Sequence, residues 1–393
     1  MIVVARLHAS LSLIDPWLDL AFPLATALLC LDQSRWAYGV LGLWLLLRLA
    51  RQALKEHWAW LLVGLFLVNA GIILNDKGMQ PSDPTDLMVI ALAFAAGLHR
   101  STQQWRTSFA WISSSLIPLG IYGMLINGPD LLKFPGFNVN RLSFLLGILM
   151  ITAWGLGRSS PDKRSSVGWL CMASLTLPLA VMSGSRAALA APLLSLLLAA
   201  ILRHCSKGRS LVKALLGLGL IAGLSLGSLQ LWYRYAPDAA INRLSDGMRF
   251  PTALCWAKAP LKQGKALFGL GYNQKVRSHC DGDHLPIVRA AGKPEGLPHA
   301  HNVGAQLMAE TGLAGLTALV GTCFWVGQRL RQRLIAAPSG DTLVLSTLLP
   351  LSVYLLLMAM TTSYEIYLML NQVLIGFTLA ALTSPTKEIA QQQ

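Results

Sequence analysis

The stretch Leu343–Thr361, LVLSTLLPLSVYLLLMAMT, contains no charged residue and decides the fold class. A second long run, Leu211–Leu231 (LVKALLGLGLIAGLSLGSLQL), contains a single lysine. Runs of about 18 or more apolar residues with few charges are typical of helices that span a membrane. Both runs lack the two-residue alternation of a transmembrane barrel strand, so they predict helices.

The composition of the whole chain agrees with these runs. Of its 393 residues, 54% are hydrophobic and only 13% are charged, whereas soluble domains have about 25% charged residues. A soluble protein of this length needs a polar surface that so few charges cannot supply. The composition therefore excludes soluble α/β, all-β and disordered chains, and it predicts an all-α integral membrane protein that crosses the membrane many times.

The apolar runs predict about twelve transmembrane helices. They lie near 14–31, 36–50, 57–75, 86–98, 107–126, 142–157, 167–183, 187–203, 211–231, 311–328, 343–361 and 366–383. Three parts follow from them. Residues 1–231 hold helices one to nine, residues 232–310 form a large outer loop, and residues 311–393 hold the last three helices and a tail.

The positive charges predict how the chain is oriented. Cytoplasmic loops of membrane proteins collect Lys and Arg. With the N-terminus in the cytoplasm, cytoplasmic loops and tails hold 17 of the 32 Lys and Arg residues, short outer loops hold five, and the long segment 232–300 holds ten. We therefore expect cytoplasmic N- and C-termini in a bacterial inner membrane. The net charge of +14 is then mostly a topology signal, and we expect no nucleic-acid partner.

Tryptophans near the predicted helix ends are typical of anchors at the membrane surface; among them are Trp17, Trp36, Trp105 and Trp169. Two of the six cysteines, Cys255 and Cys280, fall in the outer segment, where oxidation is permitted. The sequence leaves open whether these two form a disulfide or remain separate thiols.

The outer segment has an excess of positive charge, which favours an anionic ligand. One sharper feature is Ser183-Gly184-Ser185-Arg186 at an outer turn. A guanidinium at a helix start faces the unfavourable end of the helix dipole. Arg186 therefore suggests a bound anion, because its forked donors match phosphate oxygens. The alternative is an arginine that extends to the membrane surface from a tight turn.

The other sharper feature is His301-Asn302, nine further residues, and then Gly312-Leu313-Ala314-Gly315. Asn302 is a candidate N-cap of a short helix, whose amide dipoles disfavour a charged imidazole at His301. A neutral imidazole can act as a base. We expect Thr311 and Gly312 to end this helix and begin the tenth span, with Thr311 as its N-cap. Gly312 and Gly315 would allow another helix to approach closely.

These residues resemble the O-antigen ligase family of bacterial inner-membrane glycosyltransferases, which includes O-antigen polymerases and protein O-oligosaccharyltransferases. Its signature is His, then Asn, Ser or Gln, nine residues, and Gly-x-x-Gly, which His301, Asn302, Gly312 and Gly315 match. Weaker similarities cover much of the stretch from Asn138 to Val320. They comprise Ser185-Arg186, Asn138 and Asn140 before the sixth span, Gly247-Met248-Arg249, Trp256, and Phe268-Gly269-Leu270-Gly271.

The resemblance implies transfer of a glycan from a polyprenyl-diphosphate carrier to an acceptor at the outer face. The acceptor would be lipid A–core, a lipid-linked glycan or a protein. Arg186 and Arg249 would hold the diphosphate, and His301 would activate the acceptor hydroxyl. The expected substrate contacts come from Ser185, Asn302, Asn140, Gly269 and Gly271. The reaction would need no metal and no cofactor, and it would invert the sugar carbon.

Two other kinds of site remain as alternatives. The run His279–His284 offers metal-ligand types, but its spacing matches no familiar metal site, so a solvated loop is expected and no metal. A transporter of small solutes or inorganic carbon would favour internal repeats and ionisable groups at mid-membrane. The ionisable residues Asp86, Arg141 and Glu365 all lie at span ends instead.

Overall fold

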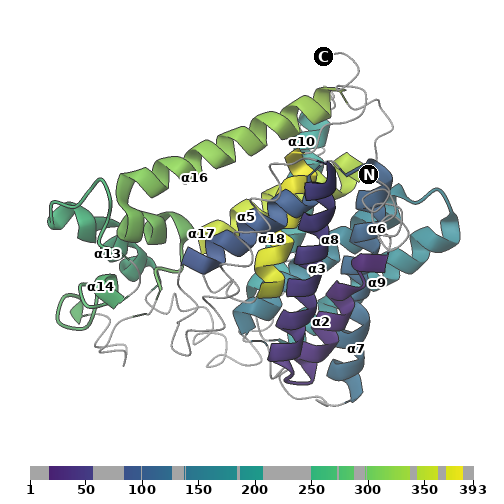
Figure 1. The fold of residues 1–393 in the computed structure, drawn as a ribbon, viewed down its shortest axis with the longest axis horizontal. Helices are drawn as coiled ribbons and strands as arrows, with labels where there is room; N and C mark the ends of the chain where they lie inside the picture. The colour runs from purple at the N-terminus through teal and green to yellow at the C-terminus, as the bar shows by residue number, and fades with distance from the viewer. Residues whose placement is uncertain are drawn as a thin grey trace, which may run out of the picture. The chain divides into compact units, whose positions relative to one another are not determined.

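The structure is a computed structural model that describes residues 17–55, 84–98, 100–125, 137, 139–183, 186–206, 249–271, 274–286, 297, 299–336, 343–361 and 369–383. Every regular element in these ranges is a helix (Figure 1). Contacts divide the chain into two compact units. The first contains 1–192, 323–358 and 365–393, and the second contains 193–322 and 359–364.

The helices of the first unit coincide with most of the predicted spans. They are α2 (Ala21–Cys30), α3 (Ser34–Lys55), α5 (Pro84–Gly97), α6 (Thr102–Ser114), α7 (Leu116–Leu125), α8 (Val139–Ser159), α9 (Lys163–Met182), η1 (Val344–Leu348), α17 (Leu349–Thr361) and α18 (Met369–Thr383), with α10 (Arg186–Ser206) beginning in it. The predicted spans 57–75 and 211–231 lie outside the described residues.

Three helices of the described chain are long and apolar enough to cross a membrane. They are Arg141–Ser159, Lys163–Met182 and Val303–Gln332. Shorter apolar helices accompany them in both units. The all-helical fold class is therefore confirmed for the described residues.

Two predicted helices are interrupted at prolines. The expected helix 107–126 is divided into α6 and α7 at Ser115, three residues before Pro118, and the expected helix 343–361 begins as the π-helical turn η1 ahead of Pro350. Proline has no N–H to donate to the carbonyl four residues earlier and its ring crowds that carbonyl, which favours a break or a wider turn just before it. The apolar pattern alone does not reveal these changes.

Small residues bring the helices of the first unit close together. A side chain at Gly97 of α5 would meet Ala380 of α18 at 2.5 Å, so α18 packs directly along α5 (Figure 1). Gly147 of α8 similarly makes room for the ring of Tyr354, whose hydroxyl donates to the carbonyl of Phe144 at 3.0 Å. Close backbone approach at small residues is the usual way in which membrane helices associate.

A buried ionic cluster around Asp19 joins several of these helices. The Asp19 carboxylate accepts hydrogen bonds from Arg48 of α3 at 2.6 Å, Trp44 of α3 at 2.9 Å and Ser108 of α6 at 2.6 Å. Arg100 donates to it at 3.2 Å from the turn before α6. All five side chains are buried, and Asp19 is an acceptor that both guanidinium groups share.

We predict that Asp19→Asn destabilises the fold by about 3–5 kcal/mol, because removing one member of a buried ionic group leaves uncompensated charge. Thermal unfolding of the purified protein in mild detergent measures the change. Asp32→Asn is the matched control: Asp32 is exposed, and its φ of 60° is a conformation that Asn tolerates well. Equal stability of the two variants would contradict a structural role for Asp19.

Candidate active site

The second unit brings together most of the segments that the sequence singles out. It contains α13 (Arg249–Lys262), α14 (Gln274–Arg277) and the first part of α16 (Val303–Ala336). One buried cluster joins them; its members are Trp256, Ala259, Leu270, Val276, Cys280, Ala300 and Ala309. Trp256 is fully buried at its centre, so this landmark of the sequence is a core residue of the unit.

His301 and Asn302 form the start of α16. The side chain of Asn302 accepts a hydrogen bond from the Ala305 N–H at 2.9 Å, which confirms the predicted N-cap. His301 has a φ of 53°, in the left-handed region that few residues other than glycine adopt. This conformation costs about 1–2 kcal/mol, so the surrounding contacts must hold it. Its side chain is half-buried.

A buried glutamine supports the turn that carries His301. Gln306 accepts a hydrogen bond from the Ala300 N–H at 2.9 Å, and its amide N–H donates to Glu310. Gln306 is fully buried and Glu310 is nearly so. The sequence analysis missed Gln306, although its four-residue spacing from Glu310 places both on one helix face. Gln306 fixes the backbone immediately before His301.

Gly312 divides α16 into two helical parts, as expected. Its φ of 68° and ψ of −156° belong to a region that is essentially restricted to glycine. The predicted N-cap at Thr311 is wrong. Thr311 is itself helical, and its hydroxyl donates to the Leu307 carbonyl at 2.8 Å, so it closes the preceding turn.

The Gly-x-Gly segment pairs with this break through backbone hydrogen bonds. They are Leu270 N–H to Ala309 at 2.8 Å, Gly271 N–H to Glu310 at 3.0 Å, Leu313 N–H to Ala266 at 2.9 Å and Ala314 N–H to Leu267 at 3.1 Å. We call this pairing of residues 266–271 with 309–314 the glycine seam. The two segments that carry the family resemblance are thus in direct contact.

Glycine is required on both sides of the glycine seam. A Cβ at Gly269 would lie 2.5 Å from the Glu310 carbonyl oxygen, and one at Gly312 would lie 2.5 Å from the Ala266 carbonyl oxygen. Gly269 also has a positive φ of 73°. The expectation that another helix approaches Gly312 is therefore wrong, because the segment that approaches it is the turn at residues 266–271. The space beside Gly315 is taken by the side chain of Thr311.

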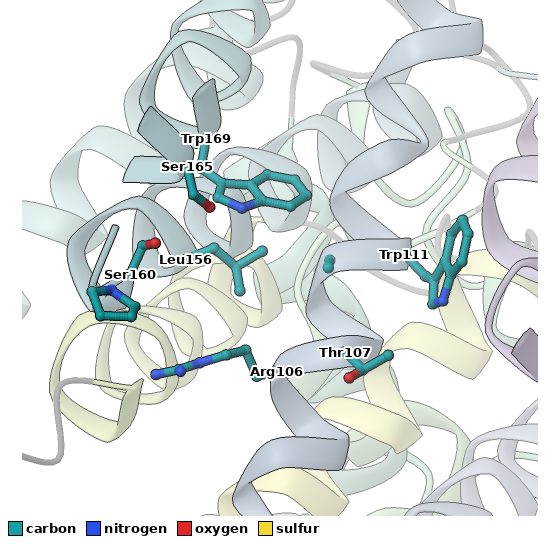
Figure 2. A pocket seen from close by; sticks show the side chains of 9 residues that line it. Arg106, Thr107, Trp111, Leu156, Ser160, Ser165 and Trp169 are labelled. Carbon is teal, nitrogen blue, oxygen red and sulfur yellow. The ribbon is translucent and has the colours of Figure 1, made fainter. Parts of the chain in front are cut away.

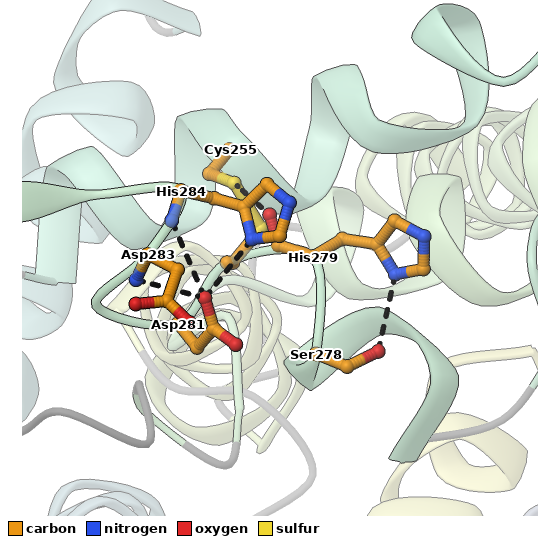
Figure 3. Close-up of a disulfide and its surroundings, with 7 residues drawn as sticks. Cys255, Ser278, His279, Asp281, Asp283 and His284 are labelled. Atoms are coloured by element: carbon orange, nitrogen blue, oxygen red, sulfur yellow. Dashed lines mark hydrogen bonds and ion pairs between the residues drawn. A yellow bond between two sulfur atoms is a disulfide. The ribbon is translucent and has the colours of Figure 1, made fainter.

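Cys255 of α13 and Cys280 form a disulfide, with Cα atoms 5.9 Å apart (Figure 3).

In the adjoining turn, Asp281 accepts hydrogen bonds from the His284 ring at 2.9 Å and from the Asp283 N–H at 3.0 Å. The His284 side-chain hydrogen bond lowers the pKa of Asp281. These bonds therefore stabilise the turn above the ordinary titration range of a carboxyl group and weaken as pH falls.

Three of the remaining predicted site residues lie at helix starts. Arg249 is exposed and begins α13, in the same unit as His301. Arg186 begins α10 in the first unit, as its sequence context suggested, and Asn140 is the second residue of α8. Ser185 lies outside the described residues. Both candidate arginines thus stand where backbone N–H groups also favour an anion.

No group of three His, Cys, Asp or Glu side chains within the described ranges is arranged to hold a metal ion. Cys280 is bonded to Cys255 and is no longer a thiolate ligand.

No known family model matches the chain, and no curated protein matches it. The geometry of the second unit therefore carries the functional argument.

We predict that Gly312→Ala destabilises the second unit by at least about 1–2 kcal/mol from its backbone conformation alone. The clash with the Ala266 carbonyl adds to this cost. Gly321→Ala is the control in the same helix: nothing lies within 4 Å of its added Cβ, so it should be neutral or slightly stabilising. Thermal unfolding in detergent compares the two, and equal midpoints would contradict the glycine seam.

We predict that peptides containing Cys255 and Cys280 remain linked when the unreduced protein is digested and analysed by mass spectrometry. The Cys255→Ser/Cys280→Ser protein should lose about 3 kcal/mol of stability, the amount expected for closing a loop of this size. Cys171→Ser is the control, because Cys171 is an exposed free thiol. Recovery of both cysteines as separate alkylated peptides from unreduced protein would refute the pairing.

Proposed function

We propose that the chain is a polytopic membrane glycosyltransferase similar to O-antigen ligases. It transfers a glycan from a polyprenyl diphosphate, such as undecaprenyl diphosphate, to an acceptor at the outer face of the inner membrane. The observation that carries this proposal is the glycine seam. It joins the Gly-x-Gly segment to the helix that begins at His301 and Asn302, within a core centred on Trp256. Segments from separate parts of the sequence thus meet on the helix whose start carries His301.

Contacts between helix ends support the proposed topology of about twelve spans. Arg106 donates to the Ser159 carbonyl at 3.2 Å, and the topology places both residues at the cytoplasmic face. Asn371 donates to the Arg141 carbonyl at 3.1 Å, and the topology places both at the outer face. Helix ends expected on the same side are thus paired in the first unit. The Asp19 cluster also joins only ends that are expected to be cytoplasmic.

The disulfide supports an outer location for the segment that contains α13. Disulfides persist in oxidising compartments such as the bacterial periplasm and are rare in the cytosol. The Cys255–Cys280 bond lies within the large segment between the ninth and tenth predicted spans. The candidate site residues Arg249 and His301 belong to the same unit. This placement fits a donor that is activated elsewhere and presented at the outer face.

The arginines would supply the electrostatic part of the reaction. Departure of a diphosphate leaving group develops negative charge, which preorganised cations stabilise. Arg186 and Arg249 each begin a helix, where the guanidinium and nearby backbone N–H groups can act together on phosphate oxygens. No metal is needed for this role. Ser185, Asn140, Asn302, Gly269 and Gly271 remain proposed substrate contacts.

His301 would activate the acceptor. The acceptor oxygen attacks the anomeric carbon while its proton passes to the imidazole, and the bond from that carbon to the diphosphate breaks. The diphosphate leaves with the electron pair, so a single displacement inverts the sugar carbon. Gln306 and the Asn302 cap hold the strained His301 backbone in place. Preorganisation of this kind is what general base catalysis requires.

We predict that His301→Ala, at normal abundance in the membrane, lowers glycan transfer by about 10²–10⁴-fold, the usual contribution of a general base. Transfer from a polyprenyl-diphosphate donor to the acceptor is measured in isolated membranes. His279→Ala is the control, because His279 is a half-buried histidine of the same unit to which we assign no role in transfer. Full transfer by His301→Ala would refute the assigned role.

A deletion strain distinguishes the acceptor classes. Accumulation of full-length lipid-linked polymer would indicate a ligase, and accumulation of single repeat units would indicate a polymerase. Unchanged surface glycan with altered solute uptake would favour the transporter instead and would contradict the proposal.

A further inference from the structure

A pocket of about 360 Å³ lies in the first unit, where the start of α6 meets the turn between α8 and α9 (Figure 2). Its lining includes Arg106, Trp111, Leu156, Ser160, Ser165 and Trp169. Figure 2 shows Arg106 extending from α6 toward Ser160, with Trp169 and Ser165 on α9. The volume falls within the range of small-molecule sites.

Arg106 is the one charged side chain in the lining. Its Nη2 donates to the Ser159 carbonyl at 3.2 Å, and its buried Nε has no hydrogen-bond partner among the described residues. A guanidinium has five N–H donors in a planar fork. The Ser165 hydroxyl adds a further donor to the same pocket, whereas the hydroxyls of Thr107 and Ser160 donate to the carbonyls of Gln103 and Asp162 at 3.2 and 3.3 Å. This donor set matches the oxygens of a phosphate group.

The surroundings of the pocket are also positively charged. Arg158 ends α8, and Lys163 and Arg164 begin α9; all three side chains are exposed. The nearest acid in sequence, Asp162, is engaged as the N-cap of α9 and accepts the Ser165 N–H at 2.8 Å. An anion in the pocket therefore meets an excess of positive charge.

The walls favour a lipid over a soluble anion. Trp111, Trp169 and Leu156 supply an apolar side to the pocket. Both α8 and α9 are apolar enough to cross a membrane, and only 22% of the apolar stretch of α9 is buried inside the described structure. Trp17, which is itself exposed, lies 5.9 Å from Trp111 between ring centroids. Tryptophans at this level are typical of the boundary between acyl chains and headgroups.

We propose that this pocket binds the phosphate of an anionic phospholipid of the cytoplasmic leaflet. Arg106 and the Ser165 hydroxyl hold the phosphate, and the acyl chains follow the apolar surface of α9. Basic pockets between membrane helices on the cytoplasmic side recognise lipid headgroups in this way. The inference rests on the proposed membrane placement but not on glycan transfer, and the test measures only lipid binding.

The test compares three variants of the full-length protein that change its net charge equally. Arg106→Gln removes the guanidinium from the pocket. Ser165→Asp adds a carboxylate to the lining and keeps the Arg106–Ser159 hydrogen bond; as an acid in the first turn of α9, it also favours the fold. Arg158→Gln, outside the lining, is the control for surface charge.

Each protein is delipidated in mild detergent and titrated with phosphatidylglycerol or phosphatidylcholine, and bound lipid is counted by native mass spectrometry. Wild type should prefer phosphatidylglycerol. Arg106→Gln and Ser165→Asp should each weaken its binding about tenfold, the loss expected for one charge-assisted hydrogen bond. Arg158→Gln should bind like wild type.

Three results would overturn the proposal. Equal binding by all four proteins, or equal weakening by all three variants, would show that the pocket is not the lipid site. Competition by inorganic phosphate or glycerol 3-phosphate as effective as that by the phospholipid would identify a soluble phosphate as the occupant instead.

Discussion

The candidate active site depends on one backbone contact, between Gly269 and the break at Gly312. A Cβ on either residue would collide with the backbone of the other segment, so no other residue type allows the two backbone segments to meet. The four hydrogen bonds of the glycine seam satisfy groups that the helix break would otherwise leave exposed. The turn that carries His301 is attached to the same helical segment through Gln306 and Asn302. The strained backbone at His301 is therefore held at the start of this helical segment, and the glycine seam holds the end of the same segment. The two ends are eleven or so residues apart, about three helical turns.

In the first unit, charged side chains are buried among apolar helices. Charged groups taken out of water are stable only when they are paired and hydrogen-bonded. Asp19 meets this condition by accepting from Trp44, Arg48, Arg100 and Ser108, and the Arg100 guanidinium also lies 5.2 Å from the Phe377 ring centroid. The cluster ties α3, the turn before α6, α6 itself and α18 to the residues before α2. It thereby fixes which helices are neighbours in a region where apolar packing alone discriminates poorly.

Apolar runs and cap residues were sufficient to predict most apolar helices of the first unit, the Asn302 cap and the Gly312 break, because these depend on local sequence, whereas α13 and α14 fall in the stretch that was predicted as a loop. Long-range pairing was not predictable. Nothing near Gly269 indicates that its partner lies some forty residues later, and nothing near Asp19 indicates Arg100. For the same reason, a tryptophan near a helix end did not show by itself whether its ring is exposed or buried. Trp17 and Trp36 are exposed as expected, whereas Trp105 is buried against Phe377 with ring centroids 4.6 Å apart. Which face of a helix meets protein or lipid depends on neighbours that a single segment does not specify.

The positive charge of the chain is therefore more than an orientation signal. Arg48 and Arg100 hold the buried carboxylate of Asp19, and Arg106 holds a helix end and lines a pocket. All three would be counted simply as cytoplasmic charges by the rule that places Lys and Arg on the inner side. A substitution by lysine would preserve that count but remove the planar fork that each contact uses. The choice of arginine at these positions is thus explained by geometry, while the predicted topology would require only a positive charge.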